Sequence, residues 1–341
     1  MKNIIESVEQ LPFVESAETK KPGRRRFITG MLGTIGTMAC YGGDVLATEI
    51  RRKRKRTEIL PLDNQEAKDA FPDTAWVLFP GFKTTWEESQ WLTRSLEPAL
   101  EQRGQLACLG YSNDGLNIHE IYDSLTSYIA ENNLSTLYFY GHSMGGMVAT
   151  EIAAKIRQTS SVDIPLIMLD SSPSSDHDVL DRSMFDWLVR ADDYDIPIPS
   201  SWRGIAELAE RIQNKNERTF PQIIDQTMEQ LSPIACSTKL MKSQASYITH
   251  FEPSRFANQL GDTRLIHIGN PQDKTVDYYR SEQGWRSSLP NNYLPTNFIL
   301  HDTQPAHASP QWNPDKYQAK MRAVQSAFLP LPKDPYQPQY Y

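Results

Sequence analysis

Apolar and polar positions alternate in blocks between residues 58 and 329. Short, almost wholly apolar runs such as Thr74-Ala75-Trp76-Val77-Leu78-Phe79 have the character of buried β-strands. Between them lie longer amphipathic segments. In one of these, Ile118, Ile121, Leu125 and Ile129 fall on one helical face. The pattern therefore predicts strands that alternate with helices.

Strands are predicted at 58–62, 74–79, 105–111, 136–140, 164–169, 263–269 and 297–300. Helices are predicted at 86–103, 118–129, 147–156, 276–286 and 318–328. This order is typical of the α/β class, with a doubly wound and mainly parallel sheet.

The alternation stops between residues 174 and 260. This stretch contains helix-like segments at 184–190, 205–212 and 222–230, several prolines, and no alternating strand pattern. We expect a helical insertion, a lid over the carboxyl ends of the strands, where such sheets bind ligands. Its aromatic and methionine side chains form either its own small core or the wall of an apolar acyl pocket.

The domain division that follows has five parts. It consists of an export signal or membrane anchor (1–47), a basic linker (48–57), an α/β core (58–173 and 261–329), the helical insertion (174–260) and a tail rich in Pro and Tyr (330–341).

Gly141-His142-Ser143-Met144-Gly145-Gly146 lies between a predicted strand and a predicted helix. A Gly-x-Ser-x-Gly pattern in this setting predicts a sharp turn that exposes the serine hydroxyl at the end of the sheet. Side chains at positions 141 and 145 would collide with neighbouring backbone. The helix that follows favours negative charge at its N-terminus. The alternative interpretation is a glycine-rich loop with an incidental serine.

The N-terminal segment has the features of a twin-arginine export signal. Arg24-Arg25 precede Arg26-Phe27-Ile28, a weakly apolar stretch follows, and Val45-Leu46-Ala47 resembles a signal-peptidase site. We expect a periplasmic, cell-surface or extracellular protein. A retained membrane anchor is the alternative, although the apolar stretch is shorter than the ~20 residues of a spanning helix.

A basic run, Arg51-Arg52-Lys53-Arg54-Lys55-Arg56, follows this segment. Blocks of like charge are usually solvated linkers. Association of residues 24–56 with an anionic membrane or envelope is a second hypothesis, and such binding would weaken as salt is raised.

Composition narrows the classes of partner. Residues 1–56 carry 12 Lys and Arg and 6 Asp and Glu, which leaves 23 basic and 36 acidic residues, a net charge of −13, for 57–341. An acidic globular part argues against nucleic acid binding. Cys40, Cys108 and Cys236 show no metal-ligand spacing, and a Cys108–Cys236 disulfide stays open. No phosphate-binding or dinucleotide motif is present, so we expect no cofactor and no metal.

The elbow, the strand order and the insertion together resemble the α/β-hydrolase superfamily, over residues 58–329. In that family the nucleophile is followed along the chain by an acid and then by a histidine. Asp273 lies in Gly269-Asn270-Pro271-Gln272-Asp273, after a predicted strand, and matches the family's acid. His307 follows the last predicted strand and matches its histidine, with Ala306 where the family often has Gly.

The resemblance implies a role for each residue. Ser143 is the nucleophile, His307 the base, and Asp273 the group that orients the histidine. The backbone N–H groups of Phe82 and Met144 form the oxyanion hole. The family often has His-Gly in the first of these loops, whereas this chain has Pro80-Gly81.

Some candidates compete with these assignments. Asp170 also follows a strand and is the alternative acid, and His301 is the alternative base. His142 and His267 have the sequence context of packed core residues. Asp176-His177-Asp178 has the context of a solvated loop.

The resulting prediction is a serine hydrolase that cleaves a carboxylic ester or thioester of small-molecule or lipid-like character. An acyltransferase, a cofactor-free lyase or carbon–carbon hydrolase, and a non-catalytic binding protein are the alternatives. The sequence does not predict the oligomeric state.

Overall fold

The computed structural model describes residues 54–180, 236–295 and 298–329. Several predicted features lie outside these ranges. They are the export segment at 1–47, most of the basic run, the helix-like segments at 184–190, 205–212 and 222–230, and the tail at 330–341.

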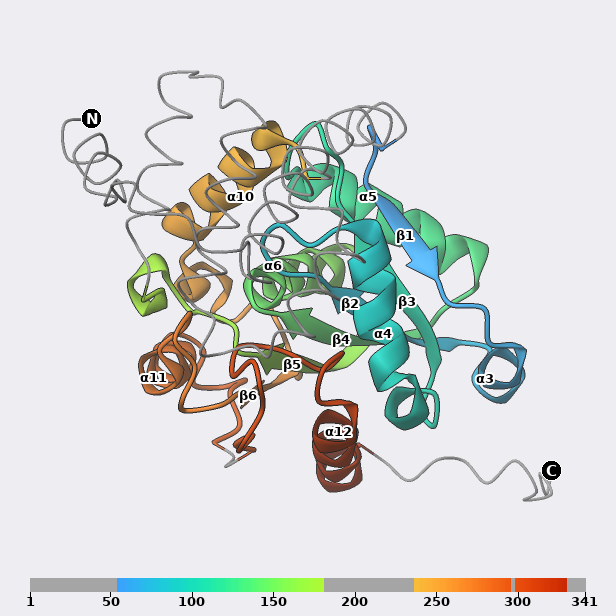
Figure 1. The fold of residues 1–341 in the computed structure, drawn as a ribbon. Helices are drawn as coiled ribbons and strands as arrows, with labels where there is room; N and C mark the ends of the chain where they lie inside the picture. The colour runs from blue at the N-terminus through green and yellow to red at the C-terminus, as the bar shows by residue number, and fades with distance from the viewer. Residues whose placement is uncertain (1–53, 181–235, 296–297, 330–341) are drawn as a thin grey trace, which may run out of the picture. The chain divides into compact units, whose positions relative to one another are not determined.

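A six-stranded sheet forms the centre of the fold, in the order β1-β3-β2-β4-β5-β6 (Figure 1). Its strands are β1 (Glu58–Pro61), β2 (Thr74–Phe79), β3 (Gln105–Gly110), β4 (Thr136–His142), β5 (Asp163–Asp170) and β6 (Arg264–Ile268). All neighbouring strands are parallel except the pair formed by β1 and β3. The predicted mainly parallel α/β fold is therefore confirmed.

Helices cover both faces of this sheet. They are α3 (Gln65–Ala70), α4 (Trp86–Leu100), α5 (Ile118–Glu131), α6 (Met144–Thr159), α10 (Thr238–His250), α11 (Tyr278–Ser288) and α12 (Pro314–Phe328). Short 3₁₀ turns occur at Asp176–Asp178 and Pro253–Phe256.

Two apolar cores follow from the alternation of side chains along the strands. In β2, Val77 and Phe79 belong to a core shared with α5, α6 and α10. Trp76 and Leu78 belong to the opposite core, which includes buried side chains of α4 and α12. Both faces of the central strands are buried, which explains why their sequences are continuous apolar runs rather than alternating ones.

Helix starts are set by side-chain caps. Asn117 accepts hydrogen bonds from the N–H groups of His119 and Glu120, and Thr85 accepts one from the N–H of Glu88. These caps place the starts of α5 and α4 where the sequence predicts them. Two helices, α3 and α10, were not among the predicted elements.

The predicted strand at 297–300 is wrong in its extent. The chain after Asn292 runs beside β6, and its described residues pair there through isolated bridges, Leu265 with Tyr293 and Gly269 with Ile299. Pro295 lies between the two bridges and has no N–H to donate to a ladder.

Arg54, within the basic run, makes contacts that a freely solvated linker would lack. The guanidinium of Arg54 donates to both carboxylate oxygens of Glu87 and lies 5.1 Å from the centre of the Trp86 ring. Its carbonyl accepts the N–H of Asn113 at 2.9 Å. The described part of the run is therefore attached to the start of α4.

Cys108 and Cys236 are buried, and no disulfide joins them to each other. Burial raises the pKa of the Cys108 thiol to about 11, consistent with its predicted role as a small apolar side chain. Among the helices within the described ranges, none is long and apolar enough to cross a bilayer.

Candidate active site

Ser143 lies at the sharp turn between β4 and α6. Its backbone has φ 53° and ψ −125°, a strained conformation for a residue with a side chain. The N–H of Ser143 donates to the carbonyl of Asp170 at 2.8 Å, and its carbonyl accepts the N–H of Gly146 at 3.0 Å. These bonds hold the turn at the carboxyl ends of β4 and β5.

The glycines of the turn are required by close backbone packing. A Cβ at position 141 would lie 2.2 Å from the Cα of Gly146, and a Cβ at position 145 would lie 1.9 Å from the carbonyl oxygen of Phe79. Real Cβ atoms do not approach backbone this closely. The steric reason predicted for both glycines is confirmed.

The structure brings three predicted site residues into one hydrogen-bonded chain. His307 Nε2 lies 3.0 Å from Ser143 Oγ, and His307 Nδ1 lies 2.7 Å from Asp273 Oδ2. A carboxylate only accepts, so Nδ1 carries the proton and Nε2 is free to accept the serine proton. This is the arrangement that turns a serine hydroxyl into a nucleophile.

Asp273 is itself held in place. Its side chain is 2% exposed, and its Oδ1 accepts the N–H groups of Thr275 at 2.7 Å and Val276 at 3.1 Å. These two backbone donors fix the orientation of the carboxyl group. The loop after β6 therefore presents an oriented acceptor to His307.

Asp170, the alternative acid, is engaged elsewhere. It is fully buried at the end of β5, and its Oδ2 accepts the hydroxyl of Tyr140 at 2.6 Å. Its Oδ1 has no hydrogen-bond partner within the described ranges. Burial, partly offset by the Tyr140 hydrogen bond, raises the pKa of Asp170 to about 7. The Nδ1 of His307 is bonded to Asp273 instead.

The other histidines lie away from the serine proton or are buried within the fold. His142 is half-buried, its Nε2 donates to the carbonyl of Ala308 at 2.7 Å, and burial together with His307 lowers its pKa to about 4. His267 is buried in β6, and burial lowers its pKa to about 4 as well. His301 is exposed. Through Ala308, the neutral His142 ring connects the elbow to the loop that carries His307.

The loop after β2 packs directly against the elbow. A Cβ at position 81 would lie 3.1 Å from the Cβ of Ser143 and 2.8 Å from the His142 ring. Phe82 follows immediately. On the other side of Ser143, Met144 is the first residue of α6, where helical N–H groups have no intrahelical acceptor. The loop that precedes Phe82 and the start of α6 therefore both lie next to Ser143.

Helix α10 also contacts this loop, and the sequence reasoning did not predict it. The side chain of Gln244 accepts the N–H of Lys83 at 3.0 Å. The signals for such a helix are present in the sequence: Ser237 at the N-cap, followed by Leu240, Ala245 and Ile248.

The Asp176–Asp178 turn lies outside the site. Asp178 accepts two N–H groups and one hydroxyl from Ser174 and Ser175, so the Asp176–Asp178 turn has a structural explanation. The described residues contain no group of three or more His, Cys, Asp or Glu placed to hold a metal.

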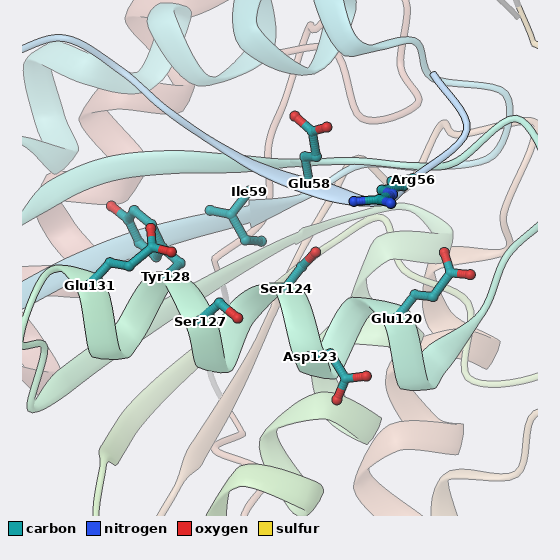
Figure 2. Close-up of a pocket in the computed structure, with 9 residues that line it drawn as sticks. All are labelled: Arg56, Glu58, Ile59, Glu120, Asp123, Ser124, Ser127, Tyr128 and Glu131. Carbon is teal, nitrogen blue, oxygen red and sulfur yellow. The ribbon is translucent and has the colours of Figure 1, made fainter. Parts of the chain in front are cut away.

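A separate groove of about 630 Å³ lies between β1 and α5 (Figure 2). Its lining is mainly acidic and hydroxylic: Arg56, Glu58, Ile59, Glu120, Asp123, Ser124, Ser127, Tyr128 and Glu131. It contains none of Ser143, Asp273 and His307.

Solved structures with the same architecture are esterases and a lactonase. A carboxylesterase of Nitrososphaera gargenis aligns with a TM-score of 0.58 at 11% identity, over 80% of this chain and 94% of that chain. The chain has the α/β-hydrolase fold. An esterase from Thermogutta terrifontis (TM-score 0.55, 12% identity, 80% and 93% coverage) and an enol-lactonase from Burkholderia xenovorans LB400 (0.54, 13%, 80% and 95%) are similar in the same way.

Sequence comparison gives shorter matches. Residues 87–186 match the family model described as a thioesterase domain. Tubby-like F-box protein 2 of Arabidopsis thaliana is 29% identical over 126 residues, which is 34% of this chain and 32% of that protein. The chain thus covers about a third of the length of this relative.

Proposed function

We propose that this α/β-hydrolase-fold protein is a serine hydrolase that cleaves a carboxylic ester or thioester through an acyl-enzyme on Ser143. The observation that carries the proposal is the hydrogen-bonded chain from Asp273 through His307 to Ser143, with distances of 2.7 and 3.0 Å. It lies at the carboxyl edge of the sheet, where α/β folds bind ligands.

The proposed reaction begins at the serine hydroxyl. His307 Nε2 removes its proton as Ser143 Oγ attacks the acyl carbonyl, and Asp273 stabilises the imidazolium that forms. The N–H groups of Phe82 and Met144 stabilise the oxyanion of the tetrahedral intermediate. His307 then protonates the leaving alkoxide or thiolate. Water, activated by the same histidine, releases the carboxylic acid.

Similarity to known proteins supports the choice of substrate class. The match to a thioesterase domain covers α4, α5, β4 and the elbow. The structural neighbours named above are esterases and a lactonase, which also act at acyl carbonyls. Thioesters and oxygen esters differ in their leaving group but share the acyl-enzyme step.

A matched pair of substrate series tests the proposal. We expect the protein to hydrolyse p-nitrophenyl esters or acyl thioesters of increasing chain length. In Ser143→Ala the turnover falls on the order of 10⁶-fold, because the nucleophile is lost. Ser135→Ala, at the opposite end of β4, keeps full activity. Hydrolysis that survives in Ser143→Ala, or none with either series, contradicts the proposal.

A further inference from the structure

The loop that carries Phe82 is held at both ends by side chains from other elements. Before it, the buried hydroxyl of Tyr111 donates to the carbonyl of Pro80 at 2.9 Å. After it, Gln244 Oε1 accepts the N–H of Lys83 at 3.0 Å, and the thiol of Cys236 donates to the carbonyl of Lys83 at 2.9 Å. The N–H of Lys83 is therefore bonded to α10, and its carbonyl is bonded to Cys236, just before that helix.

The backbone of Lys83 needs such support. Its φ is 63°, in the left-handed region that residues with a Cβ rarely adopt. The N–H that Gln244 accepts belongs to the peptide between Phe82 and Lys83. This peptide shares the Cα of Phe82 with the peptide that bears the Phe82 N–H. Fixing the Phe82–Lys83 peptide therefore restricts the ψ torsion of Phe82, which links the two peptides.

Stability alone does not explain why a glutamine occupies position 244. Its side chain is fully buried, and its Nε2 has no hydrogen-bond partner within the described ranges. An unsatisfied buried amide donor is costly, and an apolar side chain of the same shape would avoid that cost. The one bond that the amide makes from Oε1 is to the loop next to the nucleophile.

We propose that Gln244 is a positioning residue for the oxyanion hole. By fixing the Phe82–Lys83 peptide, it directs the N–H of Phe82 toward the oxyanion that forms above Ser143. It does not touch the substrate. This inference rests on the proposed serine-hydrolase function and adds that α10 takes part in assembling the site.

We expect replacement of Gln244 to weaken stabilisation of the transition state and to leave substrate binding intact. The oxyanion exists only after Ser143 has attacked, so a misdirected Phe82 N–H lowers kcat and leaves substrate binding unchanged. Loss of a whole oxyanion donor costs about 10²–10³-fold. Misdirection of one donor costs less, and we expect about a 10- to 100-fold loss of kcat.

The test compares three variants in the full chain. Gln244→Met keeps the shape but removes the acceptor, and kcat falls about 10- to 100-fold with KM changed by less than about twofold. Gln244→Glu keeps an acceptor oxygen and recovers most of the rate. Tyr247→Phe, one turn further along α10, removes the bond from Tyr247 to Glu151 (2.9 Å) and leaves kcat unchanged.

A second readout reports on the oxyanion and on the loop directly. Inhibition by a trifluoromethyl ketone, which forms an oxyanion on the serine, weakens in Gln244→Met by the same factor as kcat. Amide hydrogen exchange over residues 80–85 rises in Gln244→Met and not in Tyr247→Phe. Unchanged kcat and inhibition in Gln244→Met overturn the inference, as does an equal loss in Tyr247→Phe. A wild-type protein that neither hydrolyses esters nor binds the ketone overturns the proposed function itself, and this inference with it.

Discussion

Two buried carboxyl groups at the ends of neighbouring strands have opposite surroundings. Asp273 accepts two backbone N–H groups and faces His307. Asp170 accepts one phenolic hydroxyl and has an oxygen without a partner among the described residues. Burial raises the pKa of Asp170, whose Oδ2 is taken by Tyr140, whereas Asp273 is oriented toward His307. At the scale of single residues, this difference assigns the role beside His307 to Asp273.

Exchange of each carboxyl for an amide tests that assignment. In Asp273→Asn the amide no longer fixes the Nδ1–H tautomer of His307, and we expect kcat to fall on the order of 10⁴-fold. In Asp170→Asn the Tyr140 hydroxyl keeps an acceptor, and kcat stays within about tenfold of the wild type. Steady-state kinetics of the two purified variants decide the matter. A larger loss in Asp170→Asn would reverse the assignment.

Asp170 also predicts a pH dependence of stability. Its pKa is raised from 3.8 to about 7, so between these values the folded state holds a proton that the unfolded chain has lost. This group therefore stabilises the fold at low pH. Its contribution falls by up to about 1.4 kcal/mol per pH unit as the pH rises toward 7. In Asp170→Asn the amide does not titrate, so the free energy of unfolding does not change with pH through this position.

Urea unfolding of wild type and Asp170→Asn from pH 4.5 to 8 measures the effect. We expect the free energy of unfolding of the variant, relative to wild type, to increase up to about pH 7 and then to level off. His142 and His267, with pKa values lowered to about 4, destabilise the fold as pH falls, but they are present in both proteins. Parallel curves would show that Asp170 is ionised throughout.

At the scale of elements, strands and caps were predictable because their signals are local. Five of the six strands are apolar runs buried on both faces, and Asn117 and Thr85 mark helix starts. Of the strand predicted at 297–300, the described residues form one isolated bridge, at Ile299, because apolar character alone does not fix how a segment pairs with its neighbour. Helix α10 was not predicted because Ser243, Ser246 and Thr249 are weaker helix formers, and packing of its apolar face against the core stabilises it.

Some contacts of the site could likewise be predicted from the sequence, and others could not. Ser143, Asp273 and His307 each follow a predicted strand, and parallel strands gather their carboxyl ends at one edge. Their proximity could therefore be predicted from chain order. The bond from Gln244 to Lys83 joins residues 161 positions apart through a helix that was not expected. The bond from His142 to Ala308 depends on the path of a loop, which local sequence does not determine.

At the scale of the whole chain, the fold assembles the site from distant segments. Ser143 and His307 are 164 positions apart, and Asp273 is 34 positions from His307. The sheet brings these segments together, and α10 bonds to the loop after β2 through Gln244. The α/β-hydrolase fold is in this way the scaffold of the proposed site around Ser143.

The most direct test of this account is mass spectrometry of the intact protein after exposure to a fluorophosphonate, followed by peptide mapping. The account predicts one adduct per chain, on Ser143, with labelling lost in Ser143→Ala and strongly slowed in His307→Ala. A protein that stays unmodified, or that is labelled equally in Ser143→Ala, would contradict it.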